Sequence, residues 1–198
     1  MKSKSILFAF TAILLIGCVQ PKPQEVQEEK KIPIVELVSS FMKEHPNYLN
    51  NDVTKEEGDK AFEEAFMDTT KNYFQGVPAK LTLITKNGNS YFAQFHCWTI
   101  PNDFKYQEPV HEVNCDIVAS VSDSLVDKLV EGEYYLLKGF VIERFKTFDV
   151  MEAVLGKGTT GITDVFGLRK NDIYDDQYDV NLGYLFYHLD GIDKYNPL

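Results

Sequence analysis

The chain has 198 residues, 44% of them hydrophobic, and a formal net charge of −10. That apolar content is enough for one core, and the length is typical of a single domain. Nucleic-acid-binding proteins neutralise phosphates with an excess of Lys and Arg, so the acidic composition argues against nucleic acid as a partner. It also argues against adhesion to an anionic membrane through charge.

The first eighteen residues, MKSKSILFAFTAILLIGC, have the pattern of an export signal. Lys2 and Lys4 precede an apolar run over residues 6–16. A membrane-spanning helix needs about 20 apolar residues, so this shorter run predicts the hydrophobic segment of a signal peptide. An ordinary cleaved signal peptide, with an incidental Cys18, is the alternative.

The end of this segment, Leu15-Ile16-Gly17-Cys18, resembles the lipobox of bacterial lipoproteins. The resemblance implies that residues 1–17 are removed and that Cys18 becomes the lipid-carrying first residue of the mature chain. It therefore implies an envelope protein held to a membrane by its acyl chains. Val19 is not the Asp associated with inner-membrane retention, which favours the outer membrane where the cell has one. Periplasmic and surface-exposed orientations both stay open.

Residues 18–31 are predicted to be the lipidated Cys and a disordered tether. Residues 19–31 (VQPKPQEVQEEKK) contain only two apolar side chains, both Val, and cannot bury enough surface to order themselves. Residues 32–198 are then a single globular domain, with helices in 32–76 and strands in 77–198. Removal of Lys2 and Lys4 changes the net charge from −10 to −12, so the lipid must hold the protein at the membrane without help from basic residues.

Two helices are predicted at the start of this domain. Apolar residues recur at helical spacing over 34–42, and His45-Pro46 ends that run. The second helix is expected to begin at Thr54, where Thr54-Lys55-Glu56-Glu57 fits a capping box, and to end at Gly76. The two segments together predict a helical hairpin.

From residue 77 the pattern changes to the alternation of strands. Lys86-Asn87-Gly88-Asn89 is a strong hairpin turn, and Gly139 predicts a bulge or sharp coil. The region 146–167 is ambiguous, with a short strand at 150–155 as one interpretation. The predicted elements, in order, are strands at 79–85, 90–99 and 111–121, a short helix at 122–132, and strands at 134–145 and 180–189.

This order resembles the OB-fold. Residues 113–141 specifically resemble its tRNA-anticodon-binding-like branch, on four motifs: Val113-Asn114-Cys115, the Leu-rich helix 125–129, Glu131-Gly132 and Lys138-Gly139. The resemblance implies an α+β fold, in which a helical hairpin precedes an OB-like five-stranded antiparallel β-barrel with a short helix between strands 3 and 4. The aromatic-plus-basic strand face used for bases is not evident, so the nucleic-acid function is not carried over. A generic antiparallel α+β domain is the alternative.

Two cysteines remain besides Cys18. One register of the second and third strands places Cys97 opposite Cys115. In that register Phe95 faces Ile117 and Ala93 faces Ala119, so the register that pairs the cysteines also places these apolar residues on one face of the sheet. In an oxidising envelope the pair could form a cross-strand disulfide; two buried free thiols are the alternative. A zinc site formed by His96, Cys97, His111 and Cys115 is disfavoured, because the adjacent strand residues His96 and Cys97 point to opposite faces.

The densest acidic cluster is Asp172, Asp175, Asp176 and Asp179. Oxygen-rich loops can bind calcium outside the cytoplasm, and paired carboxylates can serve a hydrolase. The spacing is not that of an EF-hand, and an acidic surface loop is a poor place for a carboxylate with a raised pKa. A solvated loop is the preferred interpretation, with a calcium-stabilised domain and an envelope hydrolase as alternatives.

The sequence as a whole favours a lipid-anchored, non-enzymatic binding or accessory domain that uses no cofactor. OB-type domains bind along their second and third strands and the adjoining loops. Here that surface would present Trp98, Phe104 and Tyr106, which suit a peptide, protein or glycan better than nucleic acid. The alternative is that Trp98 simply caps the core.

Overall fold

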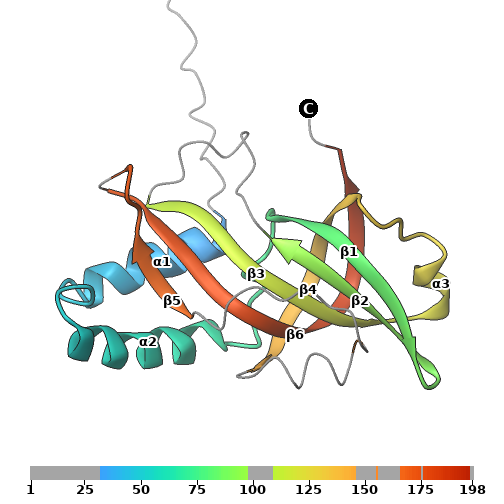
Figure 1. Cartoon of the computed structure of the whole chain (residues 1–198), viewed down its shortest axis with the longest axis horizontal. Helices are drawn as coiled ribbons and strands as arrows, with labels where there is room; N and C mark the ends of the chain where they lie inside the picture. Colours follow the sequence, from blue (N-terminus) through green and yellow to red (C-terminus); the bar gives the residue numbers. More distant parts are fainter. Residues whose placement is uncertain (1–31, 98–108, 146–154, 156–165, 175, 197–198) are drawn as a thin grey trace, which may run out of the picture. The chain divides into compact units, whose positions relative to one another are not determined.

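The fold combines two N-terminal helices with a six-stranded sheet (Figure 1). The computed structural model describes residues 32–97, 109–145, 155, 166–174 and 176–196. The α+β class expected from the sequence is therefore confirmed. The elements are α1 (Pro33–Glu44), α2 (Asp52–Phe66), β1 (Pro78–Asn87), β2 (Ser90–Cys97), β3 (Val110–Val121), α3 (Asp123–Val126), β4 (Tyr134–Phe145), β5 (Gly167–Lys170) and β6 (Tyr178–Tyr195).

None of the helices in the described ranges has the length and apolar character needed to cross a membrane.

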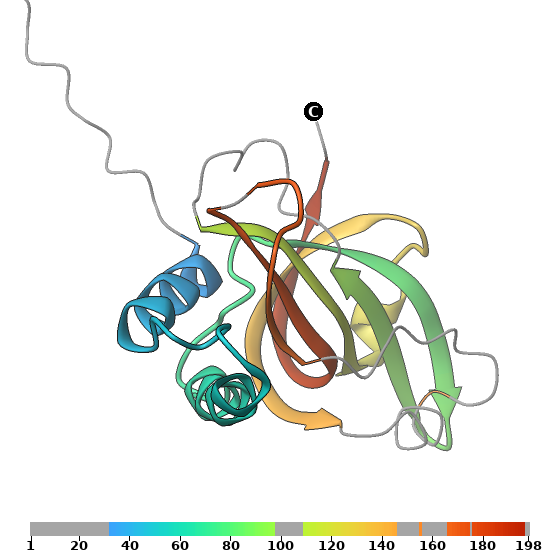
Figure 2. The same cartoon turned by 60° about the vertical axis from the view of Figure 1, so that its left-hand side comes forward.

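The sheet has the strand order β3-β2-β1-β4-β6-β5, with an additional pairing between β3 and β6. That additional pairing is parallel, and the other five pairings are antiparallel. The predicted β2–β3 register is confirmed: Cys97 lies opposite Cys115, and Phe95 lies opposite Ile117. In Figure 2, β3 and β6 run side by side along the sheet.

Helix α1 begins at Pro33 and ends at Glu44, as the sequence predicts. The predicted bounds of α2 are wrong. Its N-cap is Asn51, whose side-chain oxygen accepts from the Val53 and Thr54 amides at 3.0 and 3.1 Å, so the capping box starts three residues before the predicted one. The helix also ends at Phe66, well before Gly76.

Helix α2 ends early because side-chain oxygens accept hydrogen bonds from backbone amides that would otherwise donate within a longer helix. Asp68 accepts from the Thr70 amide at 3.0 Å, and Asn72 accepts from the Phe74 amide at 3.1 Å. Phe74 is nevertheless fully buried. The apolar residues past residue 66 are therefore apolar because a turn buries them, and not because the helix continues.

Two strand-region predictions also need correction. The helix expected over 122–132 is only α3, a single turn, and Gly132 adopts a φ of 88° in the following turn. Strand β5 was not predicted: it has four residues, two of them the exposed Arg169 and Lys170. Of the ambiguous 150–155 segment, only Leu155 lies among the described residues, and it is buried.

The bulge predicted at Gly139 is confirmed. The β4–β6 register shifts between Lys138 and Gly139, where φ is 150°. A Cβ at this position would lie 1.8 Å from the His188 carbonyl oxygen, so only glycine allows the two strands to approach this closely.

The helices and the sheet share one main hydrophobic core. Phe66 of α2 packs edge-on against Phe74 at 6.2 Å between ring centroids, and Phe74 packs edge-on against Tyr187 of β6 at 6.0 Å. Fully buried residues of β2 and β3, among them Phe95 and Ile117, belong to the same core. The helical hairpin is thus an integral part of the domain.

Tyr48, between the two helices, joins them to β5. Its hydroxyl donates to Asp59 of α2 and accepts from the Leu168 amide at 2.9 Å. Burial, reinforced by the bond to Asp59, raises the pKa of Tyr48, so the hydroxyl keeps the proton that it donates. A Cβ on Gly58 would lie 2.1 Å from the Tyr48 ring, which shows how closely the ring packs on α2.

We predict that Tyr48→Phe lowers the free energy of unfolding by about 1–3 kcal/mol, because the buried Leu168 amide loses its acceptor. Urea denaturation of the variant and the parent measures this change. Tyr134→Phe, at a position that is 39% exposed, is the matched control and should change stability by less than about 0.5 kcal/mol. Equal effects at the two positions would contradict the bridging role of Tyr48.

Candidate functional site

The first candidate site is the face of β2 and β3 that points away from the main core. Successive strand residues point to opposite faces. Because Phe95 and Cys97 belong to the main core, Gln94 and His96 lie on the opposite face of β2. We call this surface the outer face, and it comprises Phe92, Gln94 and His96 of β2 with Asp116 and Val118 of β3.

A polar network is buried on the outer face. The Asp116 side chain accepts a hydrogen bond from Gln94 Nε2 at 3.2 Å, and His96 Nδ1 lies 3.1 Å from the same carboxylate oxygen. Asp116 is only 4% exposed. A buried carboxylate costs several kcal/mol unless such partners compensate for lost water. The network therefore holds the Asp116 carboxylate at a defined, buried position on the outer face.

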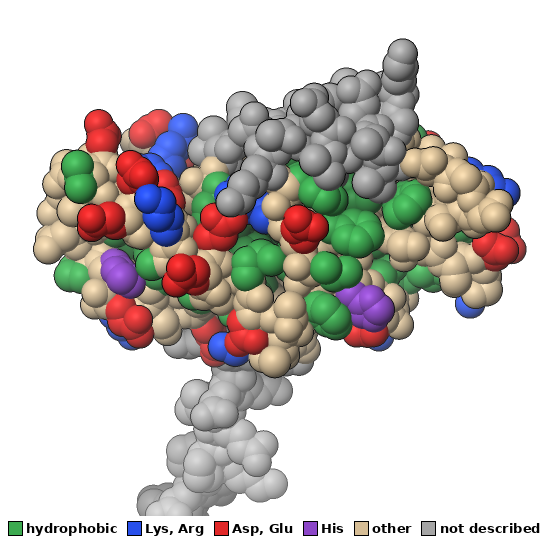
Figure 3. All heavy atoms as spheres, turned by 90° about the horizontal axis from the view of Figure 1, so that it is seen from below, with side chains coloured by type: hydrophobic (Ala, Val, Ile, Leu, Met, Phe, Trp, Pro, Cys, Tyr) green, Lys and Arg blue, Asp and Glu red, His purple; other side chains and the backbone are tan. Residues whose placement is uncertain are grey.

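An apolar cluster adjoins this network. It contains Val118, Phe145, Leu155 and Tyr184, with Leu83, Phe92 and Phe186 packed against it. The rings of Phe145 and Phe186 lie 6.0 Å apart. The sheet thus carries apolar side chains on both faces, and this second cluster is separate from the main core. In Figure 3, hydrophobic side chains gather near the middle of the face shown, with acidic side chains around them.

The predicted binding residues Trp98, Phe104 and Tyr106 lie outside the described residues, as does the loop that holds them. Cys97, which directly precedes Trp98, is the last residue of β2. The adjoining strand positions that the structure describes are therefore Gln94 and His96.

Cys97 and Cys115 are buried free thiols that lie opposite each other in the β2–β3 register. The two side chains are hydrogen-bonded, and burial followed by this contact raises the pKa of the Cys115 thiol. A raised pKa keeps a thiol protonated and slows its reaction with oxidants. The disulfide stays a prediction, and the register supplies the pairing that it requires.

The four aspartates considered for calcium or hydrolysis have different environments. Asp172 and Asp176 are exposed, Asp175 lies outside the described residues, and Asp179 is 2% exposed. Asp179 is bound by Arg169 and Asn171 within the protein. Its carboxylate therefore belongs to a different group of side chains from the exposed aspartates of the loop.

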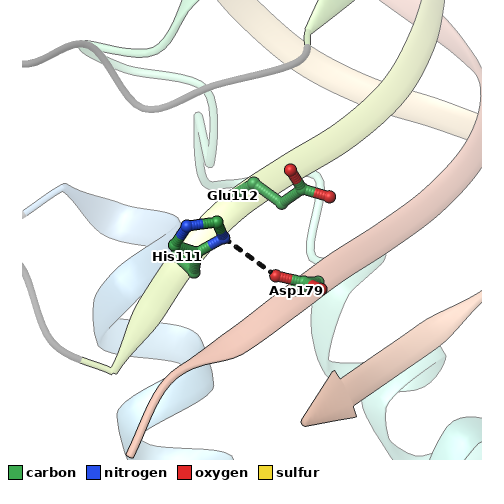
Figure 4. A group of neighbouring side chains, drawn as sticks. All are labelled: His111, Glu112 and Asp179. Carbon is green, nitrogen blue, oxygen red and sulfur yellow. Dashed lines mark hydrogen bonds and ion pairs between the residues drawn. The ribbon is translucent and has the colours of Figure 1, made fainter. Parts of the chain in front are cut away.

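That group is the second candidate site, at the end of the sheet where β3, β5 and β6 meet (Figure 4). We call it the Asp179 cluster, and it comprises His111, Glu112, Arg169, Asn171 and Asp179. His111 Nδ1 lies 3.1 Å from Asp179 Oδ1, and Asn171 Nδ2 donates to the same oxygen at 2.9 Å. Arg169 donates to the other oxygen, Oδ2, at 3.2 Å.

Sequence analysis placed His111 and Asp179 in separate sets of metal candidates and did not bring them together, because a bulge creates the cluster. Val110 pairs with Tyr178, but Glu112 pairs with Asp179, so β3 holds one extra residue at His111. The extra residue breaks the alternation of side chains, and His111 and Glu112 both reach Asp179. No glycine marks the bulge in the sequence.

Glu112 has an unusual electrostatic environment. Partial burial, and then the negative charge of Asp179, raise the pKa of Glu112 above its ordinary value. His111 and Arg169 act in the opposite direction but do not compensate fully. The Asp179 cluster thus favours any change that adds positive charge beside Glu112.

Comparison of the chain with protein-family models, with curated proteins and with solved structures found no match.

Proposed function

We propose that this chain is a lipid-anchored protein of the bacterial envelope whose OB-like domain binds a partner without catalysing a reaction on it. The lipobox at Cys18 and the tether that follows it support the anchor. The net charge, −12 once residues 1–17 are removed, supports a peptide, a protein or a glycan as the partner in preference to nucleic acid.

The strand pairings support an OB-like barrel. β1 pairs with β2 and β4, β2 with β3, β3 with β6, and β6 with β4, so each of these five strands has two partners. A ring of this kind leaves no open edge between them. The short strand β5 lies outside the ring and pairs only with β6.

The outer face is the observation that carries the binding proposal. A sheet face that is not needed for the main core is ordinarily polar and solvated. Here it holds the hydrogen-bonded Asp116 network beside the aromatic side chains of Phe92 and Phe186. Fixed polar groups next to aromatic rings are what a peptide or a sugar ring needs for orientation and contact. OB-type domains bind oligosaccharides at this same position.

We predict that Cys18→Ser moves the protein from the membrane fraction to the soluble fraction. Lipidation contributes about 0.8 kcal/mol per buried CH₂, and two or more acyl chains make the anchor effectively stable. The parent protein should be released by detergent and not by high salt, because an acidic domain gains nothing from anionic headgroups. Cys97→Ala is the control and should stay membrane-bound. A Cys18→Ser protein that remains fully in the membrane would show that the lipobox interpretation is wrong.

We predict that Trp98→Ala and Phe92→Ala each weaken binding to arrayed envelope peptides or glycans by at least about tenfold, since aromatic anchors carry much of the energy of such interfaces. Tyr134→Ala, an exposed aromatic position of β4, is the control and should bind like the parent.

Two results would contradict this assignment. Retention of every ligand by both aromatic variants would exclude the outer face and its adjoining loop as the binding surface. Turnover of a peptide, glycan or phosphoester that is abolished by Asp176→Asn would establish the alternative, a hydrolase that uses the acidic loop.

A further inference from the structure

We propose that the Asp179 cluster is a site for a divalent transition-metal ion such as Zn²⁺, bound by His111, Glu112 and Asp179. This site is independent of the outer face and goes beyond the binding function proposed above. One ligand atom from each of the three side chains lies within 4.8 Å of the others. In Figure 4 the three side chains come from two neighbouring strands, and His111 points toward Asp179.

The separation of two of the ligand atoms already matches a coordinated ion. His111 Nδ1 and Asp179 Oδ1 lie 3.1 Å apart. Two ligand atoms that each bind a zinc ion at about 2.1 Å, at an angle near 90–110°, lie about 3.0–3.4 Å apart. The third ligand is available because the bulge at His111 brings Glu112 to the same side of β3.

The surrounding side chains orient the ligands as second-shell groups do in metal proteins. The Asn171 amide oxygen accepts from the Ile173 and Tyr174 amides, both at 2.9 Å, which fixes the orientation of the side chain and points its NH₂ group at Asp179. Arg169 holds the second oxygen of Asp179. The carboxylate is therefore fixed in position before an ion arrives.

The local charge also favours a cation. Glu112 and Asp179 contribute two negative charges and Arg169 one positive charge, so the cluster with neutral His111 carries about −1. His111 Nδ1 also lies 3.0 Å from Asn171 Nδ2. Because Nδ1 also lies 3.1 Å from Asp179 Oδ1, an ion binds only when this nitrogen carries no proton and gives up both contacts, while Asn171 keeps its bond to Asp179. The His111 side chain is 36% exposed, so an ion can reach it from solvent.

The donor set selects the kind of ion. One imidazole nitrogen with two carboxylates suits Zn²⁺ and neighbouring first-row ions. Ca²⁺ needs six to eight oxygen ligands, and Mg²⁺ keeps several waters and prefers oxygen. We therefore expect Zn²⁺ to bind more tightly than Ca²⁺ or Mg²⁺ by at least about tenfold.

The test is titration of the full chain, in detergent, with Zn²⁺ alone by isothermal titration calorimetry. One ion should bind per chain, and the thermal unfolding midpoint should rise with Zn²⁺ concentration. His111→Ala and Glu112→Gln should each weaken binding by at least about tenfold. His188→Ala is the matched control: His188 also lies 3.1 Å from a carboxylate, that of Asp190, but it lies outside the Asp179 cluster. This variant should bind like the parent.

Co²⁺ provides an independent spectroscopic readout. An ion held by His111, Glu112 and Asp179 gives visible d–d bands without a thiolate-to-cobalt charge-transfer band. A charge-transfer band would place the ion at Cys97 and Cys115 and overturn the proposal. Unchanged affinity in Glu112→Gln, a variant that removes a half-buried charge and keeps the side-chain shape, would also overturn it. So would binding of Ca²⁺ at least as tight as that of Zn²⁺.

Discussion

The parallel pairing of β3 with β6 is the constraint on which the rest of the structure depends. β3 is hydrogen-bonded to β2 on one side and to β6 on the other, so a strand near the middle of the chain and the last strand share one sheet. Parallel neighbours need a long connection, and here more than 50 residues separate Val121 from Tyr178. The pairing gives β3 its second neighbour, so that each strand from β1 to β4 is paired on both sides. It also places Glu112 directly opposite Asp179, which makes the Asp179 cluster possible.

Strand β5 has two roles despite its four residues. It pairs with β6, and its Leu168 amide donates a hydrogen bond to the hydroxyl of Tyr48 in the helical hairpin. Arg169 in β5 and Asn171, just beyond it, both bind Asp179 of β6. The short strand therefore connects the docking of the helices to the geometry of the Asp179 cluster.

The outer face and the Asp179 cluster differ in how they hold a buried carboxylate. Asp116 lies on β3, which is paired with β2 on one side and with β6 on the other, and its partners Gln94 and His96 both come from β2. Asp179 lies at the end of the sheet, and its partners come from two segments of the chain, β3 and residues 169–171. The first arrangement fixes a buried carboxylate beside the half-buried aromatic rings of the outer face. The second suits a site that an ion enters from solvent.

Regular periodicity made much of the fold predictable. The alternation of apolar residues around Cys97 and Cys115 predicted the β2–β3 register residue by residue, and Gly139 marked its bulge because no other residue tolerates that approach. Side chains that compete with the backbone could not be weighed from the sequence, so Asp68 and Asn72 end α2 earlier than its apolar pattern suggested. Four residues of β5, half of them charged, gave no strand pattern.

The Asp179 cluster was unpredictable for a related reason. The expectation that neighbouring strand residues point to opposite faces holds on regular strands and fails at the His111 bulge, where the extra residue carries no glycine to mark it. The partners of Asp179 are also distant in sequence from His111, and only the β3–β6 pairing brings them together. The Asp179 cluster could therefore be predicted only with knowledge of the β3–β6 pairing.

Hydrogen–deuterium exchange of the β3 amides tests this pairing most directly. A strand with partners on both sides has its alternate amides bonded in opposite directions, so all of them should exchange slowly. We expect uniform protection from Cys115 to Ala119, where β3 is paired with both β2 and β6, comparable to that of Phe95 of β2 in the main core. Protection of alternate residues only, with fast exchange at the amides that point toward β6, would show that β3 has an open edge and would contradict the account.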